Sequence, residues 1–421
     1  MQGREVFLLG SNRIGFCRAY TGYADQTNLQ LLSAALNGLV DRYGLQGVQI
    51  DEVTAGAVVV HSSDWNLARE AVLNTQLAPQ SVGTTLQMAC GTSLQGALLL
   101  AGKIASGQID CAIAAGTDSI SDAPLSTSRK LASRLVKAQR AKTLGAKLAA
   151  FKGLSLRELA PLPPSTHEPR TGLSMGQHCE LMAQQWGIRR EDQDQWAIES
   201  HHKAHAAYQR GFYDDLVSGH NGVLRDTHIR ADANLQEMAA LKPAFDRANG
   251  TLSAGNSTPL TDGASSVLLG TREWAMAHGL PILARIQAGR TAANHFTAGE
   301  GLLMAPTQAV ADLLKQTHLS LQDFDLYELH EAFAAQVLCT LKAWEDDEFC
   351  HGLGATEALG PIDRDKINPV GSSLALGHPF AATGARVLGV AGHWLDQQAA
   401  KRALISVCTA GGMGVAAILE R

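Results

Sequence analysis

The sequence lacks the features that mark membrane-spanning, secreted disulfide-rich and zinc-binding proteins. No stretch of its 421 residues is apolar for long enough to cross a bilayer. The seven cysteines include no Cys-x-x-Cys pair, which argues against a structural zinc site or a disulfide framework. The apolar run before Gly10 is too short for a signal peptide, and the chain ends without a retention or peroxisomal tail. We therefore expect a cytoplasmic protein without a metal site.

Aromatic residues are also scarce, at 5% of the chain, whereas glycine is abundant at 41 residues. Short glycine clusters beside apolar runs are typical of the tight strand–helix junctions of α/β proteins. The net charge of −5 argues against a nucleic-acid partner. A chain of 421 residues has room for two or three domains around a large core.

Strands and helices alternate in the first and last thirds of the chain. The first third predicts strands at 6–10, 55–61 and 111–115, and helices at 28–43, 66–77 and 94–106. The last third predicts a strand ending at 330, helices at 331–336 and 383–397, and a hairpin of strands 403–408 and 414–419. This alternation predicts a parallel or mixed sheet with helices on its faces. The similar order in the two thirds indicates an internal duplication.

The middle third has a different composition. Between Ala123 and Arg157 there are nine basic residues and no acidic one, with leucines interleaved among them. Such a basic amphipathic segment suits a membrane surface, an anionic partner or a phosphorylated ligand, although it could also be an ordinary solvated helix face. We predict a cap domain at 121–249, inserted between an N-terminal half (1–120, with 250–271 returning to it) and a C-terminal half (272–421).

Cys90 lies between an apolar run and a segment of helix formers. A cysteine at the start of a helix is close to unpaired N–H groups and to the positive end of the helix dipole. We expect this environment to favour the reactive thiolate. The alternative is that Cys90 is a small buried hydrophobic residue, as most intracellular cysteines are.

Four further sites are candidates for chemistry. His378 is fixed between glycine and proline in a loop of small residues, and neutral imidazole is the usual base for activating a thiol. Cys408 ends a strand at a glycine-rich turn, and we expect the two cysteines to face each other from matching positions of the two halves. His330 could be a core histidine or a hydrogen-bond donor. The small polar residues from Ala254 to Gly263 could bind a ligand or form an ordinary loop.

Together these motifs resemble those of the thiolase family. The matching segments occur in family order over nearly the whole chain: Gln87-Met88-Ala89-Cys90-Gly91-Thr92-Ser93, His330-Glu331-Ala332-Phe333, Gly377-His378-Pro379 with Ala381-Ala382-Thr383-Gly384, and Cys408-Thr409-Ala410-Gly411-Gly412. The resemblance implies a thiolase-like α/β fold, in which two similar halves form a layered αβαβα core with an inserted cap (loop) domain. It also implies acyl transfer between a thiol and a 3-ketoacyl thioester, with coenzyme A as substrate and no tightly bound cofactor.

The resemblance assigns a role to each candidate. Cys90 would attack the ketone, His378 would take its proton, and Cys408 would protonate the departing enolate and deprotonate CoA. One oxyanion hole would use His378 and His330 with a water, and the other the backbone N–H groups of Cys90 and Ala410. Met175, Thr258 and Phe333 would line the substrate and CoA site.

Two positions depart from the commoner family pattern, since His330 replaces asparagine and Ala410 replaces glycine. An alanine at 410 keeps a backbone donor in place only if its φ is negative. His330, the basic insert and Pro161–Pro164 resemble the branch of bacterial long-chain 3-ketoacyl-CoA thiolases and the trifunctional-protein β subunit.

That branch implies fatty acid β-oxidation, a homodimer or dimer of dimers, a hydratase/dehydrogenase partner subunit and membrane contact through 123–157. We consider three alternatives to this function, of which two stay open and one is disfavoured. Acetoacetyl-CoA synthesis by Claisen condensation and a non-catalytic CoA-binding or scaffolding subunit stay open. A 3-ketoacyl synthase is disfavoured by Cys408.

Overall fold

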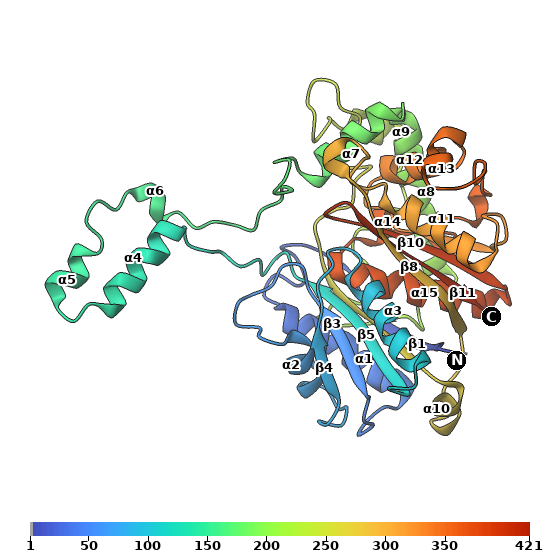
Figure 1. Cartoon of the computed structure of the whole chain (residues 1–421), viewed down its shortest axis with the longest axis horizontal. Coiled ribbons are helices and arrows are strands. Elements are labelled where there is room, and N and C mark those ends of the chain that lie inside the picture. The colour runs from blue at the N-terminus through green and yellow to red at the C-terminus, as the bar shows by residue number, and fades with distance from the viewer. Residues whose placement is uncertain (1–2) are drawn as a thin grey trace.

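The computed structural model describes residues 3–421 and places the strands in one mixed sheet of eleven strands (Figure 1). The main path through the sheet runs β4 (Val82–Thr85), β3 (Glu52–Gly56), β5 (Cys111–Asp118), β7 (Thr261–Gly270), β1 (Phe7–Ile14), β8 (Ala284–Ala293), β11 (Met413–Glu420), β10 (Arg402–Thr409) and β9 (Leu326–Leu329). Two short strands lie off this path: β2 (Cys17–Arg18) pairs with β7, and β6 (Val217–Ser218) pairs with β1.

The two halves of this sheet have the same topology. The order β3-β5-β7-β1 in the N-terminal half matches β9-β10-β11-β8 in the C-terminal half. In each half the first pair is parallel and the next two pairs are antiparallel. The half-sheets meet where β1 pairs with β8, at Phe7 with Arg285 and Leu8 with Ala284. The duplication expected from the sequence is therefore present in the fold.

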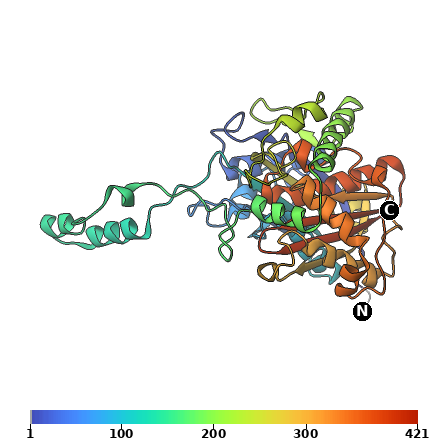
Figure 2. The same cartoon turned by 90° about the horizontal axis from the view of Figure 1, so that it is seen from above.

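Helices cover both faces of both half-sheets (Figures 1 and 2). The N-terminal half packs α1 (Asn28–Tyr43) and α2 (Leu67–Leu73) on one face, and the C-terminal half packs α11 (Ala305–Thr317) and α12 (Ala334–Trp344) on its outer face. The helices α3 (Thr92–Ala105) and α15 (Thr383–Gln398) lie between the two half-sheets. The helices and half-sheets together form the αβαβα layers that the family resemblance implied.

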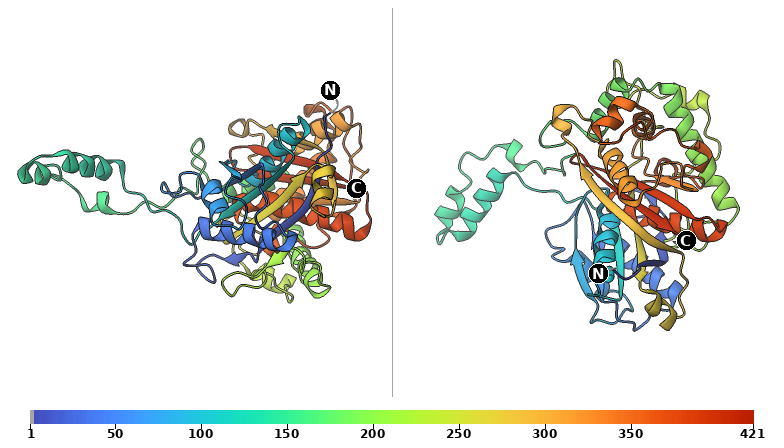
Figure 3. Two further views of the ribbon diagram at one scale, coloured as in Figure 1. Left: turned by 90° about the horizontal axis from the view of Figure 1, so that it is seen from below. Right: turned by 45° about the vertical axis from the view of Figure 1, so that its right-hand side comes forward.

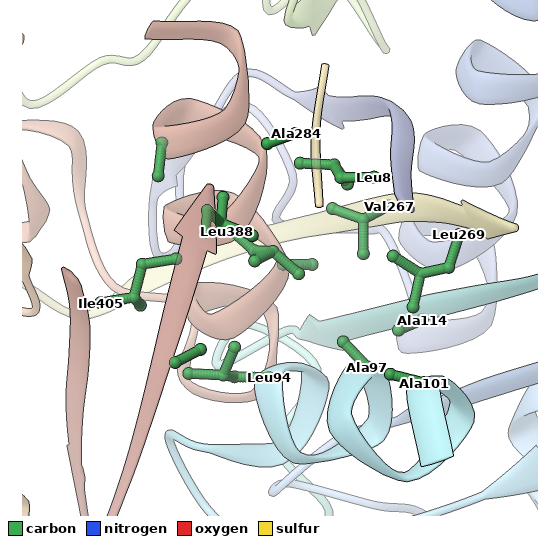
Figure 4. Packing of buried hydrophobic residues seen from close by; sticks show 14 of the residues in the cluster. Leu8, Leu94, Ala97, Ala101, Ala114, Val267, Leu269, Ala284, Leu388 and Ile405 are labelled. Carbon is green, nitrogen blue, oxygen red and sulfur yellow. The ribbon is translucent and has the colours of Figure 1, made fainter. Parts of the chain in front are cut away.

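Strand periodicity explains the layers. Phe7 and Leu9 of β1 point to the cluster around α1, whereas Leu8 points to the middle cluster. On β10 the alternation is the same, since Ile405 faces the middle layer and Leu404 faces α11. Alternate side chains of a strand point to opposite faces, so apolar residues at consecutive positions bury both faces of a sheet. Figure 4 shows part of the middle layer, with Leu94 of α3, Leu388 of α15 and Ile405 of β10.

Residues 123–163 form an arm that projects from the body (Figures 1 and 3). It contains α4 (Arg129–Arg140), α5 (Leu144–Ala149) and α6 (Leu156–Leu159). Arg134 and Glu158 pair at 3.2 Å within it, and Ser126 bonds to Leu162 at its base. The rest of the expected cap includes α7 (Met175–Gln185), α8 (Arg190–Gln209) and α9 (Leu235–Ala240). The domain boundaries given above stay a prediction.

The remaining helices are short. They are α10 (Arg272–Ala277), α13 (Asp347–Gly352), α14 (Ser373–Leu376) and the 3₁₀ turns η1 (Phe296–Ala298), η2 (Arg364–Lys366) and η3 (Phe380–Ala382). Within residues 3–421, no helix combines the length and the apolar character that a membrane crossing needs.

Two predicted elements are wrong in extent. The strand expected at 55–61 ends at Gly56, because the N–H groups of Val58 and Val59 leave the ladder and donate to the Asp118 carboxylate. The helix expected from Glu331 begins only at Ala334, since Phe333 is extended and pairs with Ser257. The other predicted strands and helices are present, with ends shifted by a few residues.

The close packing of α15 on α3 predicts opposite effects of the same substitution at two helical glycines. A Cβ at Gly384 would lie 2.2 Å from the backbone nitrogen of Leu94, whereas nothing lies within 4 Å of a Cβ at Gly102. Gly384→Ala should lower the free energy of unfolding by about 1–3 kcal/mol. Gly102→Ala should raise it by up to about 1 kcal/mol, because alanine favours the helix. Urea denaturation measures both, and similar effects at the two sites would contradict the proposed crowding.

Candidate active site

Cys90 is presented by a tight turn between β4 and α3. Ala89, just before it, has φ of +45°, a left-handed conformation that is uncommon for a residue with a side chain. The hydroxyl of Thr92 holds this turn, since it accepts from the Met88 N–H at 2.8 Å and donates to the Ala89 carbonyl at 2.7 Å. The turn leaves the half-buried Cys90 side chain beside the N-terminus of α3.

His378 contacts Cys90 directly. Its Nε2 lies 3.1 Å from the Cys90 Sγ, and its Nδ1 lies 2.6 Å from the Thr383 Oγ1. Its backbone N–H donates to Thr261 Oγ1 at 3.1 Å, so the start of β7, within the 254–263 segment singled out above, positions this histidine. If Nδ1–H donates to Thr383, the Nε2 lone pair faces the thiol. The pair can then transfer a proton from sulfur to nitrogen.

The expectation that Cys90 is a thiolate at rest is wrong. Burial raises the pKa of Cys90 to about 12, and the nearby charge of Asp118 adds to this effect. Burial also lowers the pKa of His378 to about 3. Desolvation penalises both charged forms and outweighs the favourable helix N-terminus. The resting pair is therefore a neutral thiol beside a neutral imidazole, and the thiol needs His378 as its base.

Two backbone donors converge on the Cys90 sulfur. The backbone N–H groups of Ala410 and of Cys90 itself are directed at it and partly offset the rise in its pKa. Ala410 is not among the described residues with positive φ, so the alanine at this position keeps its N–H in place. An oxygen on a carbon bonded to Sγ would lie near these donors, which is the arrangement that stabilises an oxyanion.

Cys408 lies at the end of β10 and is 2% exposed. Burial raises its pKa well above the usual range, so the Cys408 thiol is also protonated at rest. Its neighbour Thr409 packs against Gly91, since a Cβ on Gly91 would lie 2.7 Å from the Thr409 Cγ2, and this contact brings the two cysteines close together. The prediction that they occupy matching positions of the two halves is wrong. Cys90 precedes helix α3, and the equivalent place in the second half is the His378 loop before α15. The two cysteines approach each other where the end of β10 meets the turn before α3.

His330 completes the cluster, and its ring centroid lies 4.2 Å from that of His378. Its Nδ1 is 2.7 Å from the Ser373 Oγ, whereas its Nε2 is buried without a hydrogen-bond partner. Burial lowers the pKa of His330 well below the usual value, so the ring is neutral. Because a serine hydroxyl can donate or accept, the ring can present either an N–H or a lone pair at Nε2. His330 therefore lies against the Cys90–His378 pair with an unpartnered ring nitrogen.

A fully buried ion pair supports this histidine, and the sequence analysis missed it. Arg386 Nη2 donates to Ser373 Oγ at 2.6 Å, and its Nη1 bonds to Glu328 Oε1 at 2.5 Å. Both side chains of the pair are 0% exposed. The signal in the sequence was a charged residue within an apolar strand (Glu328) and another on the buried face of a helix (Arg386), since such charges are rare without a partner.

Glu331, next to His330, connects the surrounding segments through four hydrogen bonds. Its carboxylate accepts from Trp196 Nε1 at 3.0 Å and Ser200 Oγ at 2.7 Å, both on α8. It also accepts from Asn368 Nδ2 at 2.9 Å and the Leu374 N–H at 3.2 Å. These four bonds tie α8 to the loop that carries His378.

The three residues expected to line the CoA site lie in or beside the buried cluster that contains Cys408. Phe333 belongs to the same buried cluster as Cys408, and Met175 packs against that cluster. The hydroxyl of Thr258 donates at 3.0 Å to the carbonyl of Ala332, which belongs to the cluster too. The fold thus brings Met175, Thr258 and Phe333 together from three separate segments.

The neutral resting pair predicts how the reactivity of Cys90 depends on pH. The thiolate fraction of a thiol with a raised pKa increases about tenfold with each pH unit, and it does not reach a plateau below that pKa. Alkylation of Cys90 by iodoacetamide should therefore rise about tenfold per unit between pH 6 and 9. Mass spectrometry of the Cys90 peptide measures it, with Cys90→Ala as the blank. A plateau that begins below pH 7 would instead indicate a preformed thiolate–imidazolium pair.

Sequence and structure comparisons agree with this geometry. The family described as Thiolase, N-terminal domain matches residues 6–273, and Thiolase, C-terminal domain matches 280–421. The chain is 38% identical over 426 aligned positions to the 3-ketoacyl-CoA thiolase of Yersinia pestis (strain Pestoides F), covering 100% of this chain and 97% of the relative.

Two solved structures are similar over almost their whole length. The Bacillus anthracis acetyl-CoA acetyltransferase has a TM-score of 0.83 at 27% identity, with 100% of this chain and 99% of that one covered. The human mitochondrial 3-ketoacyl-CoA thiolase in complex with CoA has a TM-score of 0.82 at 26% identity, covering 99% and 98% of the two chains. The resemblance predicted from the motifs is confirmed: the chain belongs to the thiolase family of acyltransferases.

Proposed function

We propose that this protein cleaves 3-ketoacyl-CoA with a second CoA, through an acyl-Cys90 intermediate, and yields acetyl-CoA and a shortened acyl-CoA. The observation that carries the proposal is the 3.1 Å contact between His378 Nε2 and Cys90 Sγ, with Cys408 beside it. The names of the relatives support the substrate class, because both a bacterial relative and a human neighbour are 3-ketoacyl-CoA thiolases.

In the first half-reaction, Cys90 Sγ attacks the 3-keto carbon while its proton passes to His378 Nε2. The alkoxide accepts hydrogen bonds from the N–H groups of Cys90 and Ala410. The carbon–carbon bond then breaks, and the electron pair leaves as the acetyl-CoA enolate. Its oxygen can accept from His330 Nε2, directly or through a water, and its carbon takes the Cys408 proton.

In the second half-reaction, the Cys408 thiolate removes the proton of an incoming CoA thiol. The CoA sulfur attacks the thioester carbon on Cys90, and the shortened acyl-CoA leaves. The Cys90 thiolate recovers its proton from His378, so every group returns to its starting state. Run in reverse, the same steps form a carbon–carbon bond by Claisen condensation.

CoA is the substrate in this proposal, and no tightly bound cofactor takes part. Met175, Thr258 and Phe333 are proposed to line its path because they gather on the Cys408 side of the site. The basic residues of the 123–157 segment are candidates for its phosphates, without assignment to a single lysine or arginine.

We propose that the protein forms a homodimer, or a dimer of dimers, through the edge strand β4. This strand pairs on one side only, with β3, and three of its four residues are exposed. Val82 on β4 and Leu99 on the neighbouring α3 are 54% and 49% exposed, which gives the edge an apolar border. An unpaired edge of this kind is a ready template for a second strand. Analytical ultracentrifugation measures the oligomeric state, and a monomer at micromolar concentration would contradict the proposal.

We also propose that the arm contacts an anionic membrane surface in the cytoplasm. Eight of its nine basic residues are exposed, and Arg134 is the one that pairs with an acid within the described chain. Leu144 and Leu148 beside them are 74% and 67% exposed. Basic and apolar residues together favour an anionic lipid surface. Flotation with phosphatidylserine vesicles measures this; no binding would instead favour a hydratase/dehydrogenase subunit as the partner of the arm.

Replacing Cys408 tests the proposed reaction. Cys408→Ala should reduce thiolysis by about 10²- to 10⁴-fold, because a general acid–base group contributes that much. Alkylation of Cys90 should change little, since His378 still serves as its base. Cys350→Ala, at another buried cysteine away from the site, is the matched control and should keep wild-type activity. Thiolysis near the wild-type rate in Cys408→Ala would overturn the mechanism.

Substrate length separates degradation from synthesis. If the protein serves fatty acid β-oxidation as a long-chain thiolase, kcat/KM for thiolysis should rise from four-carbon to longer 3-ketoacyl-CoA substrates. A rate confined to acetoacetyl-CoA would favour the biosynthetic alternative, and no turnover with any length would favour a non-catalytic CoA-binding or scaffolding subunit. Steady-state thiolysis across four to sixteen carbons provides the measurement.

A further inference from the structure

The reacting groups also have the composition of a metal site. One ligand atom from each of Cys90, His330 and His378 lies within 4.8 Å of the other two. A thiolate with two imidazoles is a common ligand set for Zn²⁺, and a site with three protein ligands keeps a fourth position open. The spacing rules applied to the sequence do not reveal this site, because its ligands come from three distant segments.

The separations are close to those of a tetrahedral zinc centre. With Zn–S near 2.3 Å and Zn–N near 2.0–2.1 Å, ligand atoms lie about 3.3–3.6 Å apart. The Cys90 Sγ and His378 Nε2 are 3.1 Å apart, and the third atom is at most 4.8 Å from each. A shift of about an ångström by side chains would therefore bring all three into range.

The histidines are already oriented for such a centre. Each has its Nδ1 on a hydroxyl, His378 on Thr383 at 2.6 Å and His330 on Ser373 at 2.7 Å. A metal-bound histidine is held in this way, with its far ring nitrogen bonded to a neighbouring polar group. The His330 Nε2 atom is a second indication that a ligand binds here. His330 is 1% exposed, and this atom has no hydrogen-bond partner in the described structure. A buried polar atom of this kind normally has one.

We propose that Cys90, His378 and His330 form a reversible Zn²⁺ site in the free enzyme, with water as the fourth ligand. On binding, the Cys90 sulfur and one nitrogen of each ring donate a lone pair to the metal, and the thiol proton is released to solvent. Cys90 cannot then attack a substrate, so Zn²⁺ and acylation exclude each other. The ion enters from the side on which the half-buried Cys90 lies, because the two histidines are more deeply buried.

His330 is the residue that turns a catalytic pair into a chelating triad. An asparagine in place of His330 would leave the Cys90–His378 pair without a third strong ligand. An amide oxygen is a weak ligand for zinc, whereas imidazole is a strong one. Zinc affinity should therefore follow the identity of residue 330 more than that of any other residue outside the Cys90–His378 pair.

Cobalt provides a direct probe of this site. Co²⁺ added to the full-length enzyme, without CoA and with a phosphine reductant in place of thiols, should give a thiolate-to-cobalt charge-transfer band and the visible bands of tetrahedral Co²⁺. Zn²⁺ should remove both by competition, which yields its affinity. Cys90→Ser should abolish the charge-transfer band. His330→Asn should weaken Zn²⁺ binding by about 10- to 100-fold, as loss of an oriented ligand does.

Two controls separate this site from the other cysteines and from misfolding. Cys111→Ala removes a buried thiol at the start of β5 and should leave the spectrum and the affinity unchanged. In the wild-type enzyme, Zn²⁺ should slow iodoacetamide labelling of Cys90, and a chelator should restore it. A spectrum without the charge-transfer band, equal zinc affinity in His330→Asn, or unprotected Cys90 would each overturn the proposal. None of these outcomes bears on thiolysis, because no substrate is present.

Discussion

The packing of α3 against α15 is the constraint on which the site depends. Cys90 sits at the start of α3, and His378 sits in the loop that leads into α15. Gly384 lets the two helices approach so closely that a Cβ there would meet the Leu94 backbone. The same region is fixed by Ser93, whose hydroxyl donates to the Ala381 carbonyl at 2.6 Å and accepts from the Ala385 N–H at 2.8 Å. A distance of 3.1 Å between sulfur and nitrogen follows from contacts between two halves of the chain.

Burial determines the charge state of the reacting groups. It keeps the thiol protonated and both histidines uncharged at neutral pH. A neutral cluster avoids the cost of an isolated charge in a low-dielectric interior, and it still allows a proton to pass between sulfur and nitrogen when a substrate arrives. Arg386 and Glu328 are buried together close by, and Arg386 hydrogen-bonds to the serine that holds His330. The same neutral donors are also the ligands from which the zinc proposal is built.

Much of the fold could be predicted from local patterns. The helix over Asn28–Tyr43 has the predicted ends, because a Thr27 capping box starts it and Gly44 in a left-handed conformation stops it. The strand at 55–61 was misplaced, since Val58 to Val60 are as apolar as a strand but their loop is held by Asp118. The helix after His330 was misplaced for a similar reason, as Phe333 pairs with a distant segment. Long-range hydrogen bonds of this kind leave no periodic signal in the sequence.

Local patterns were enough to identify the family, the two-half architecture and the four side chains around which the site is built, because motifs and alternating elements are local properties. They did not reveal the protonation state of Cys90: the helix dipole alone predicts a thiolate, whereas the buried side chain is a neutral thiol. The protonation state of Cys90 depends on the folded chain as a whole, since desolvation depends on every segment that covers the sulfur. The pairing of Arg386 with Glu328 also depends on tertiary contacts, as does the approach of ligand atoms of Cys90 and His330, 240 positions apart, to within 4.8 Å of each other.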